Sequence, residues 1–484
     1  SIYRNILKPA KMNPESFIIM RHELVLTVAF LFILVAEVFT GERNKEKIKG
    51  IAVVLFAIVT AVGFLPAATG SLFGGMYQAS ATTTLMKNIL NIGTLIVLIQ
   101  SYTWLGRPEN RDRIHEYFLL LISTLIGMNF MISSGHFLMF YLGIELATIP
   151  LAALAAYDRY QNKSAEAGIK LILSSTLSSG ILLFGLSMIY GVTGSLYFTE
   201  VAAKLTSVPL VIMGFIFFFA GMGFKMSLVP FHLWTADVYE GAPVNVTSYL
   251  SVVSKGAAAF IFVIILFRVF PVISVTWEKV IWVIAVMTIT IGNLFALRQK
   301  NMKRFLAFSS IAQAGFFLLG FIGGNQLGMT TVIYYALIYI FSNLAAFGVV
   351  AVIAEKTGKE SMDDYDGLYR TNPGLSITMM LAMFSLAGIP PVAGFFGKFF
   401  LFVAAAEKGF YVLVTIAVLN TIIALYYYLL VVKAMFINKS EAPVAPFKSD
   451  FMQKLGLAIC IAGIIVTGFA SGLFEFIRNL SYGI

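Results

Sequence analysis

The chain has 484 residues, of which 59% are hydrophobic and only 12% are charged, and its mean hydropathy is +0.87. Soluble domains carry about 25% charged residues, so this composition excludes a soluble enzyme and indicates a membrane protein. The net charge of +10 is spread over short loops, where lysine and arginine set membrane orientation, and does not indicate a nucleic-acid surface. The single cysteine, Cys460, lies in the last apolar segment, which excludes disulfides, iron–sulfur clusters and thiolate metal sites within the chain.

Apolar segments of about 20 residues, long enough to cross a bilayer, recur along the whole sequence. They predict an all-α polytopic membrane protein, with residues 1–484 forming a single membrane domain. The basic stretch Ser1–Lys11 precedes a span-length segment without a small-residue cleavage site, so we expect a first helix rather than a signal peptide. The fourteen predicted transmembrane helices are 17–39, 49–66, 83–103, 117–133, 137–157, 166–192, 208–234, 244–267, 278–298, 303–322, 328–354, 375–406, 411–437 and 453–474.

The seventh predicted helix runs into the most informative stretch, Gly221–Pro243, which reads GMGFKMSLVPFHLWTADVYEGAP. Lys225 lies deep in this apolar segment, where a charge costs about 2.5–3.5 kcal/mol. Pro230 removes a backbone donor and interrupts the helix. Broken backbone at membrane depth is tolerated only where protein or water satisfies its free groups. Together the lysine and the break indicate part of an ion pathway.

The twelfth predicted helix is too long for one straight span and contains Gly388-Ile389-Pro390-Pro391, followed by Lys398. A pair of interrupted helices in corresponding positions is typical of an inverted repeat around a midplane site. The broken helices are five apart, an odd offset, so we predict two five-helix units of opposite topology. The predicted parts are helices 1–3 (1–116), repeat one (helices 4–8, 117–267), repeat two (helices 9–13, 278–437) and a last helix (453–474).

Lysine and arginine gather in the loops that follow odd-numbered predicted helices. By the positive-inside rule these loops are cytoplasmic, which leaves both termini on the outer, periplasmic side. The basic stretch Ser1–Lys11 favours the opposite orientation, but only weakly.

Few ionisable residues fall in the middle of predicted helices. Glu145 lies at the middle of helix 5 and Lys255 at the middle of helix 8. Each type of residue has an ordinary structural alternative. A buried carboxylate can simply pair with a neighbouring cation and hold helices together. A lysine near a helix end can extend its ammonium group to the membrane interface. The interface interpretation fits Lys87, Lys433 and Arg268, and it fails for Lys225 and Lys255.

Burial lowers the pKa of a lysine, and a nearby carboxylate raises it again. A lysine whose carboxylate partner approaches or withdraws can therefore bind and release protons near neutral pH. We expect Glu145 and Lys225 to form such a switch, with Lys255 as a relay and Lys398 as the exit or its counterpart in repeat two. A metal site is not expected, because lysines repel cations and no His/Asp/Glu cluster has ligand spacing.

Two further relay candidates have ordinary alternatives. His232 follows the Pro230 break and could instead bond the freed backbone, while Lys170 could form a simple i,i+4 pair with Glu166. Asp237 and Glu240 are expected to be loop or surface residues. The tenth helix offers small polar residues suited to close packing or water binding, namely Ser309, Ser310 and Gln313.

Several long motifs resemble the antiporter-like membrane subunits of bacterial respiratory complex I. These motifs are KMSLVPFHLWTADVYEGAP, IELATIPLAALAAY, FLAFSSIAQAGFFLLG and GIPPVAGFFGKF. Within that family, residues 165–194 and the number of helices are most similar to the subunit N group of NADH:quinone oxidoreductase. The family's larger members carry a long lateral C-terminal helix, and this sequence ends soon after the fourteenth predicted helix.

The resemblance implies two inverted repeats, a central polar axis, and proton pumping coupled to quinone reduction in partner subunits. It assigns Glu145 and Lys225 as the carboxylate–lysine pair, Lys255 as the central lysine and Lys398 as the terminal lysine. NADH, FMN, iron–sulfur clusters and quinone are expected in partner subunits of the complex, and the location is the bacterial inner membrane. The alternatives are a subunit of a multisubunit cation/proton antiporter or membrane-bound hydrogenase, and a passive scaffold within the same complex.

Overall fold

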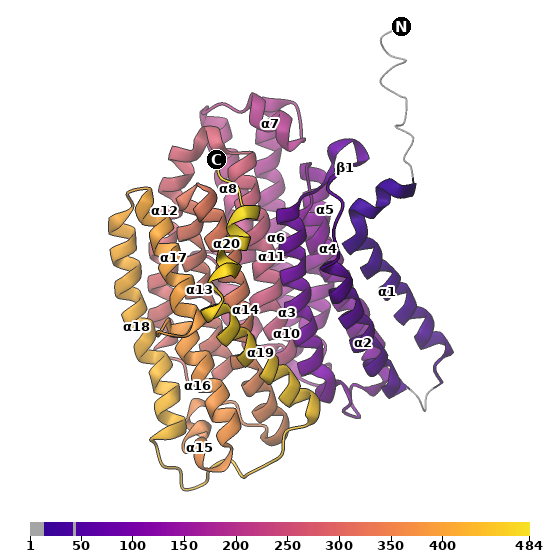
Figure 1. Cartoon of the computed structure of the whole chain (residues 1–484), viewed down its shortest axis with the longest axis vertical. Helices are drawn as coiled ribbons and strands as arrows, with labels where there is room; N and C mark the ends of the chain where they lie inside the picture. Colours follow the sequence, from indigo (N-terminus) through magenta and orange to yellow (C-terminus); the bar gives the residue numbers. More distant parts are fainter. Residues whose placement is uncertain (1–13, 42–44) are drawn as a thin grey trace.

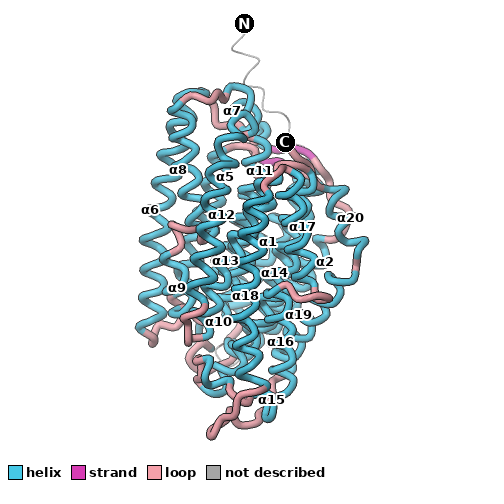
Figure 2. Tube along the Cα trace, turned by 90° about the vertical axis from the view of Figure 1, so that its left-hand side faces the viewer, coloured by secondary structure: helices cyan, strands magenta, loops and turns pink. Residues whose placement is uncertain are grey.

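The computed structural model describes residues 14–41 and 45–484. Its long helices run side by side and form one bundle, as Figures 1 and 2 show from two directions. The prediction of an all-α polytopic membrane protein is confirmed, with one small hairpin as the only sheet among the described residues. The predicted role of the basic stretch Ser1–Lys11 lies outside those residues.

The N-terminal part packs two helices and a hairpin beside a more buried third helix. Its elements are η1 (Pro14–Met20), α1 (Arg21–Phe39), α2 (Lys45–Gly63), β1 (Gly70–Leu72), η3 (Phe73–Gly75), β2 (Tyr77–Ala79) and α3 (Ala81–Leu105). The antiparallel pair β1–β2 aligns Leu72 with Tyr77. A capping box at Ser80 starts α3, because its hydroxyl accepts from the Thr83 amide and satisfies a free donor of the first turn.

The remaining elements follow the order predicted for the two repeats and the last helix. The segment predicted as repeat one comprises η4 (Arg111–Arg113), α4 (Ile114–Ile132), α5 (Phe137–Ala155), α6 (Asn162–Thr193), α7 (Phe198–Lys204), α8 (Pro209–Met226), α9 (Leu233–Gly241), α10 (Val244–Tyr249), η5 (Leu250–Ser254) and α11 (Lys255–Arg268). The segment predicted as repeat two, together with the C-terminal part, comprises η6 (Pro271–Ile273), α12 (Ser274–Ala296), α13 (Met302–Gly323), α14 (Gln326–Thr357), η7 (Met362–Tyr365), α15 (Leu368–Thr371), α16 (Pro373–Ala387), α17 (Ala393–Glu407), α18 (Tyr411–Phe436), α19 (Phe451–Phe469) and α20 (Ser471–Leu480).

Both predicted breaks are confirmed. The α8 helix ends at Met226, where Ser227 takes a left-handed conformation with φ 62°, and Pro230 lies in the loop before α9. The α16 helix ends at Ala387, and Gly388 takes the left-handed position with φ 84° that glycine commonly occupies after a helix. The breaks follow from local chemistry, since neither proline can continue the preceding helix.

Twelve helices in the described residues are long and apolar enough to cross a membrane. The second and twelfth of the fourteen predicted helices are not among these twelve. The α2 helix begins with three lysines within its first five residues, and the twelfth predicted helix is divided into α16 and α17, each of 15 residues. The start of α1 and the C-terminus lie at the same end of the bundle (Figure 1), as an even number of crossings requires. The count of fourteen and the inverted repeats remain predictions.

The core of the bundle is formed by α13, α14 and the segment from α10 to α11, all of which are almost wholly buried. Helices at the periphery instead expose large apolar side chains, for example Ile169, Leu173 and Leu177 on α6. Such side chains suit the bilayer or a partner subunit. The buried pair α13 and α14 therefore forms the support on which the internal polar residues are arranged.

Candidate functional site

The predicted pair on α5 and α8 is close but not joined. The Lys225 Nζ donates a hydrogen bond of 2.7 Å to the Thr148 hydroxyl of α5. Glu145 precedes Thr148 by three residues, so it lies about one turn away on the same helix. Its Oε1 is buried and has no hydrogen-bond partner among the described residues, although the carboxylate still acts electrostatically on Lys225. The lysine therefore binds a neutral oxygen while the carboxylate stays available.

Lys255 lies at the centre of the bundle, with only 1% of its surface exposed. It follows directly after η5, one turn of π-helix over Leu250–Ser254, and such turns are frequent at functional sites. Its Nζ donates to the Ser310 carbonyl oxygen at 3.1 Å and also to the Ser310 hydroxyl. The Tyr339 hydroxyl donates to the same serine at 2.9 Å. The Tyr239 ring centre lies 5.8 Å from the Lys255 Nζ.

Lys398 lies on α17, which follows the second break, and is 3% exposed. Its Nζ donates to the carbonyl oxygens of Leu386 at 2.8 Å and Ala387 at 3.4 Å. These are the last two residues of α16, so their carbonyls belong to the negative end of that half-helix. The interruption of the twelfth predicted helix thus supplies the acceptors for its own lysine.

Polar groups of α13 continue from Lys255 towards Lys398. Gln313 lies one turn after Ser310, and its Nε2 donates to the Leu386 carbonyl at 3.1 Å, the oxygen that also binds Lys398. Its Oε1 accepts a hydrogen bond from the Tyr335 hydroxyl. Ser310 therefore binds Lys255 directly, and Gln313 shares the Leu386 carbonyl with Lys398.

The two further relay candidates lie apart from these lysines. Lys170 is 40% exposed and pairs with Glu166 at 2.6 Å, which confirms the predicted i,i+4 contact, and with Asp237 at 2.7 Å. His232 immediately precedes α9, and its Nδ1 is buried without a hydrogen-bond partner in the described part of the chain. Their relay roles remain predictions.

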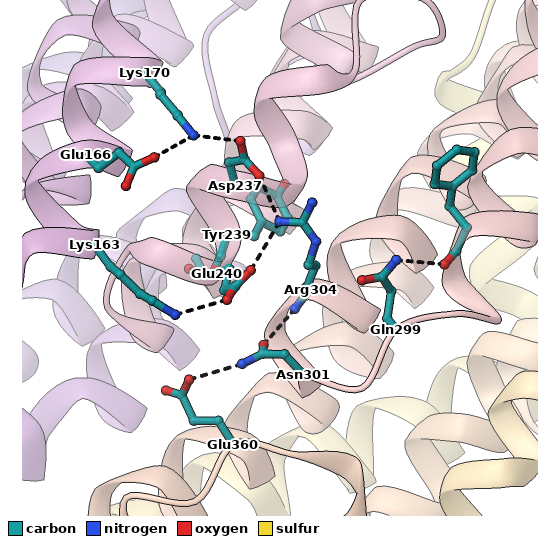
Figure 3. Close-up of polar contacts among 12 residues, drawn as sticks. Lys163, Glu166, Lys170, Asp237, Tyr239, Glu240, Gln299, Asn301, Arg304 and Glu360 are labelled. Atoms are coloured by element: carbon teal, nitrogen blue, oxygen red, sulfur yellow. Dashed lines mark hydrogen bonds and ion pairs between the residues drawn. The ribbon is translucent and has the colours of Figure 1, made fainter.

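Asp237 and Glu240 are partly buried in an ion-pair network rather than free at the surface. The network consists of these two carboxylates of α9, Arg304 of α13, and Lys163 and Lys170 of α6 (Figure 3). Burial by itself would raise the pKa of both carboxyl groups. The hydrogen bonds from the surrounding cations outweigh it and hold both pKa values below their usual range. Both groups are therefore anionic near neutral pH.

Residues 134–424, more than half of the chain, match the family described as NADH:quinone oxidoreductase/Mrp antiporter, transmembrane. The chain belongs to this family. It is 49% identical over 469 residues to NADH-quinone oxidoreductase subunit N of Phocaeicola vulgatus, covering 97% of this chain and 99% of that protein. It is 50% identical over 477 residues to the protein of the same name from Azobacteroides pseudotrichonymphae, covering 98% and 99%. A chain of respiratory complex I from Thermus thermophilus superposes with a TM-score of 0.78 at 26% identity, covering 94% of this chain and 98% of that one.

A deeply buried carboxylate–lysine pair lies outside the segment that matches the family. Lys87 of α3 and Glu23 of α1 form an ion pair of 2.6 Å, each with 2% of its side chain exposed. The Tyr77 hydroxyl of β2 donates to the other Glu23 oxygen at 2.8 Å and accepts from Lys87 at 2.9 Å. The expectation that Lys87 reaches the membrane interface is wrong, because the hairpin and α1 cover it. The sequence feature that could have indicated this pair is Glu23, a carboxylate within the first predicted helix.

Proposed function

We propose that this chain is the subunit N-type, proton-translocating membrane subunit of a respiratory NADH:quinone oxidoreductase. The observation that carries the proposal is full-length similarity, at about half identity, to proteins named NADH-quinone oxidoreductase subunit N. The chain contributes to the enzyme as a translocase subunit. NADH, FMN, the iron–sulfur clusters and quinone would be bound by partner subunits.

The internal geometry supports a proton-carrying role for three lysines. Lys225, Lys255 and Lys398 all donate to neutral oxygens, whether hydroxyl or backbone carbonyl. A buried ammonium without a carboxylate partner is poorly stabilised relative to neutral lysine, so its proton can leave at moderate cost. Lys87 provides the contrast within the same chain, because its ammonium contacts a carboxylate, that of Glu23, at 2.6 Å.

We infer a switch at α5. With Lys225 bound to Thr148, its ammonium is not neutralised and is prepared to pass a proton towards Lys255. Movement of the ammonium by about one helical turn would join it to Glu145 and raise its affinity for a proton. Lys255 then transfers charge along the polar side of α13 towards Lys398, which is the exit in repeat two. Ionisable residues inside membranes commonly form such relays.

A polar cavity supports access from the end of the bundle at which α9 and the loop before α13 lie. It measures about 340 Å³ and is lined by charged residues, including Arg107, Asp158, Lys163, Lys303 and Glu355. The positive-inside rule assigns this end to the cytoplasm, with both termini on the periplasmic side of the inner membrane. Protons would be taken up through this cavity.

The proposal is tested by purifying the intact assembly and measuring proton uptake in membrane vesicles driven by NADH. Co-purification with flavin and iron–sulfur subunits, and NADH-driven uptake that requires this chain, are expected. Isolation with only cation/proton antiporter subunits, or with hydrogenase subunits, would contradict the proposal and assign the chain to that other complex. Undiminished pumping after Glu145→Gln together with Lys225→Ala would instead favour a passive scaffold.

A further inference from the structure

The short helix α9 presents two different sides to its surroundings. Asp237 and Glu240 are three residues apart, so they share one side of the helix, and both belong to the ion-pair network. Tyr239 projects from another side because it is offset by about 200° from Asp237. It is fully buried. The α9 helix therefore connects a charged rim to the interior of the bundle.

Every carboxylate oxygen on the charged side binds a cation, and two of the four share Arg304. Arg304 Nη1 binds Asp237 Oδ1 at 2.8 Å and Glu240 Oε2 at 3.1 Å. The remaining oxygens bind Lys170 at 2.7 Å and Lys163 at 3.2 Å. As Figure 3 shows, Arg304 approaches α9 from repeat two and the lysines approach from repeat one. The half-helix is thus held between the two repeats.

On the interior side, Tyr239 meets the central lysine. Its ring centre is 5.8 Å from the Lys255 Nζ, within the range of a cation–π contact. The acceptor of that lysine, Ser310, lies on α13, six residues after Arg304. One helix therefore fixes both the position of α9 and the oxygen atoms that bind Lys255.

We propose that Arg304 is a positioning residue for Lys255, which acts by holding α9, and with it the Tyr239 ring, against α13. This inference rests on the proposed function, since it concerns the proton relay at Lys255. Arg304 itself stays outside the relay. Without it, α9 keeps its ties to α6 but loses its only ion pairs to repeat two among the described residues. The ring and the lysine would then no longer be fixed relative to each other.

The test uses the intact complex in membranes and measures proton uptake per NADH oxidised, normalised to subunit content. Arg304→Gln should lower this ratio about fivefold. Arg304→Lys should recover part of it, because lysine keeps the charge but lacks the planar guanidinium group. Arg298→Gln is the matched control. Arg298 is exposed just before α13, and loss of its charge should leave the ratio unchanged.

A double-substitution cycle separates positioning from general stability. If Arg304 acts through Tyr239, Arg304→Gln should cause little further loss in a Tyr239→Leu background. Independent structural damage would instead multiply the two losses. If Arg304→Gln prevents assembly, Glu240→Gln replaces it, because this change weakens the same contact and leaves Asp237 bound.

Two results would overturn the inference: full pumping by the Arg304→Gln complex, or multiplied losses in the cycle. Lys255→Ala is measured in parallel, so that failure of the positioning role can be distinguished from failure of the proposed function. Normal pumping by the alanine variant would refute the proposed function itself. Loss of pumping with Lys255→Ala but not with Arg304→Gln would refute only the positioning role.

Discussion

Lys225 of α8 is bound to Thr148 of α5 at 2.7 Å, while the carboxylate expected to pair with it lies one turn away on the same helix. Thr148 and Glu145 thus offer two acceptors, one neutral and one anionic, within reach of one side chain movement. The structure holds the lysine at the neutral acceptor. This arrangement gives the predicted carboxylate–lysine switch a defined disengaged state.

Replacement of Thr148 by valine removes the acceptor and keeps the shape of the side chain. Because a hydrogen bond to a charged group contributes about 1.5–3 kcal/mol, we expect Thr148→Val to reduce NADH-driven proton uptake roughly tenfold or more. Thr148→Ser retains the hydroxyl and should pump nearly normally. Equal uptake by the two variants, in vesicles with equal subunit content, would show that the hydroxyl has no part in the switch.

The Glu145–Lys225 pair is tested by removing both charges. A single neutralisation leaves one charge without its partner, at a cost of about 3–5 kcal/mol for a buried pair, so Glu145→Gln or Lys225→Met should impair pumping and assembly together. In the double variant we expect assembly to recover while pumping stays lost. Subunit content and proton uptake are measured on the same membranes, and recovery of both would reduce the pair to a structural role.

Lys255 should be indispensable for proton transfer. Lys255→Ala removes the group that binds the proton, and Lys255→Arg keeps a charge that cannot be released, because arginine stays protonated. Both variants should therefore lose most of the proton uptake, as followed with a pH-sensitive dye. Substantial activity of the arginine variant would mean that this position needs only a positive charge.

The Glu23–Lys87 pair should affect stability and not pumping. Glu23→Gln or Lys87→Met leaves a buried charge unpaired and should destabilise the chain by about 3–5 kcal/mol, seen as a lower yield of detergent-extracted complex. The combined change should restore much of the yield. Proton uptake per assembled complex should stay normal throughout. A specific loss of uptake would place this pair in the proton pathway.

The sequence predicted the features that depend on local chemistry. Pro230 and Pro390 interrupt their helices whatever surrounds them, so both breaks could be located in advance. The positions of Lys255 and Lys398 followed from apolar segment length. The order of the predicted helices also corresponds to the observed elements, because bilayer thickness imposes a simple length rule.

Contacts between distant segments could not be predicted in this way. Nothing near Lys225 in the sequence names Thr148 as its partner, 77 residues earlier. Lys87 was misplaced for the same reason. Its position near a helix end suggested an exposed ammonium, whereas a hairpin ten residues upstream and a carboxylate 64 residues upstream enclose it.

The Glu23–Lys87 pair also bears on how the chain is made. Glu23 leaves the ribosome long before Lys87, so the first helix must wait with an unneutralised carboxylate until the third is synthesised. An isolated carboxylate is unfavourable in lipid, which should keep α1 at the insertion machinery rather than release it into the bilayer. We therefore expect the first three helices to enter the membrane as one unit, completed when the lysine arrives.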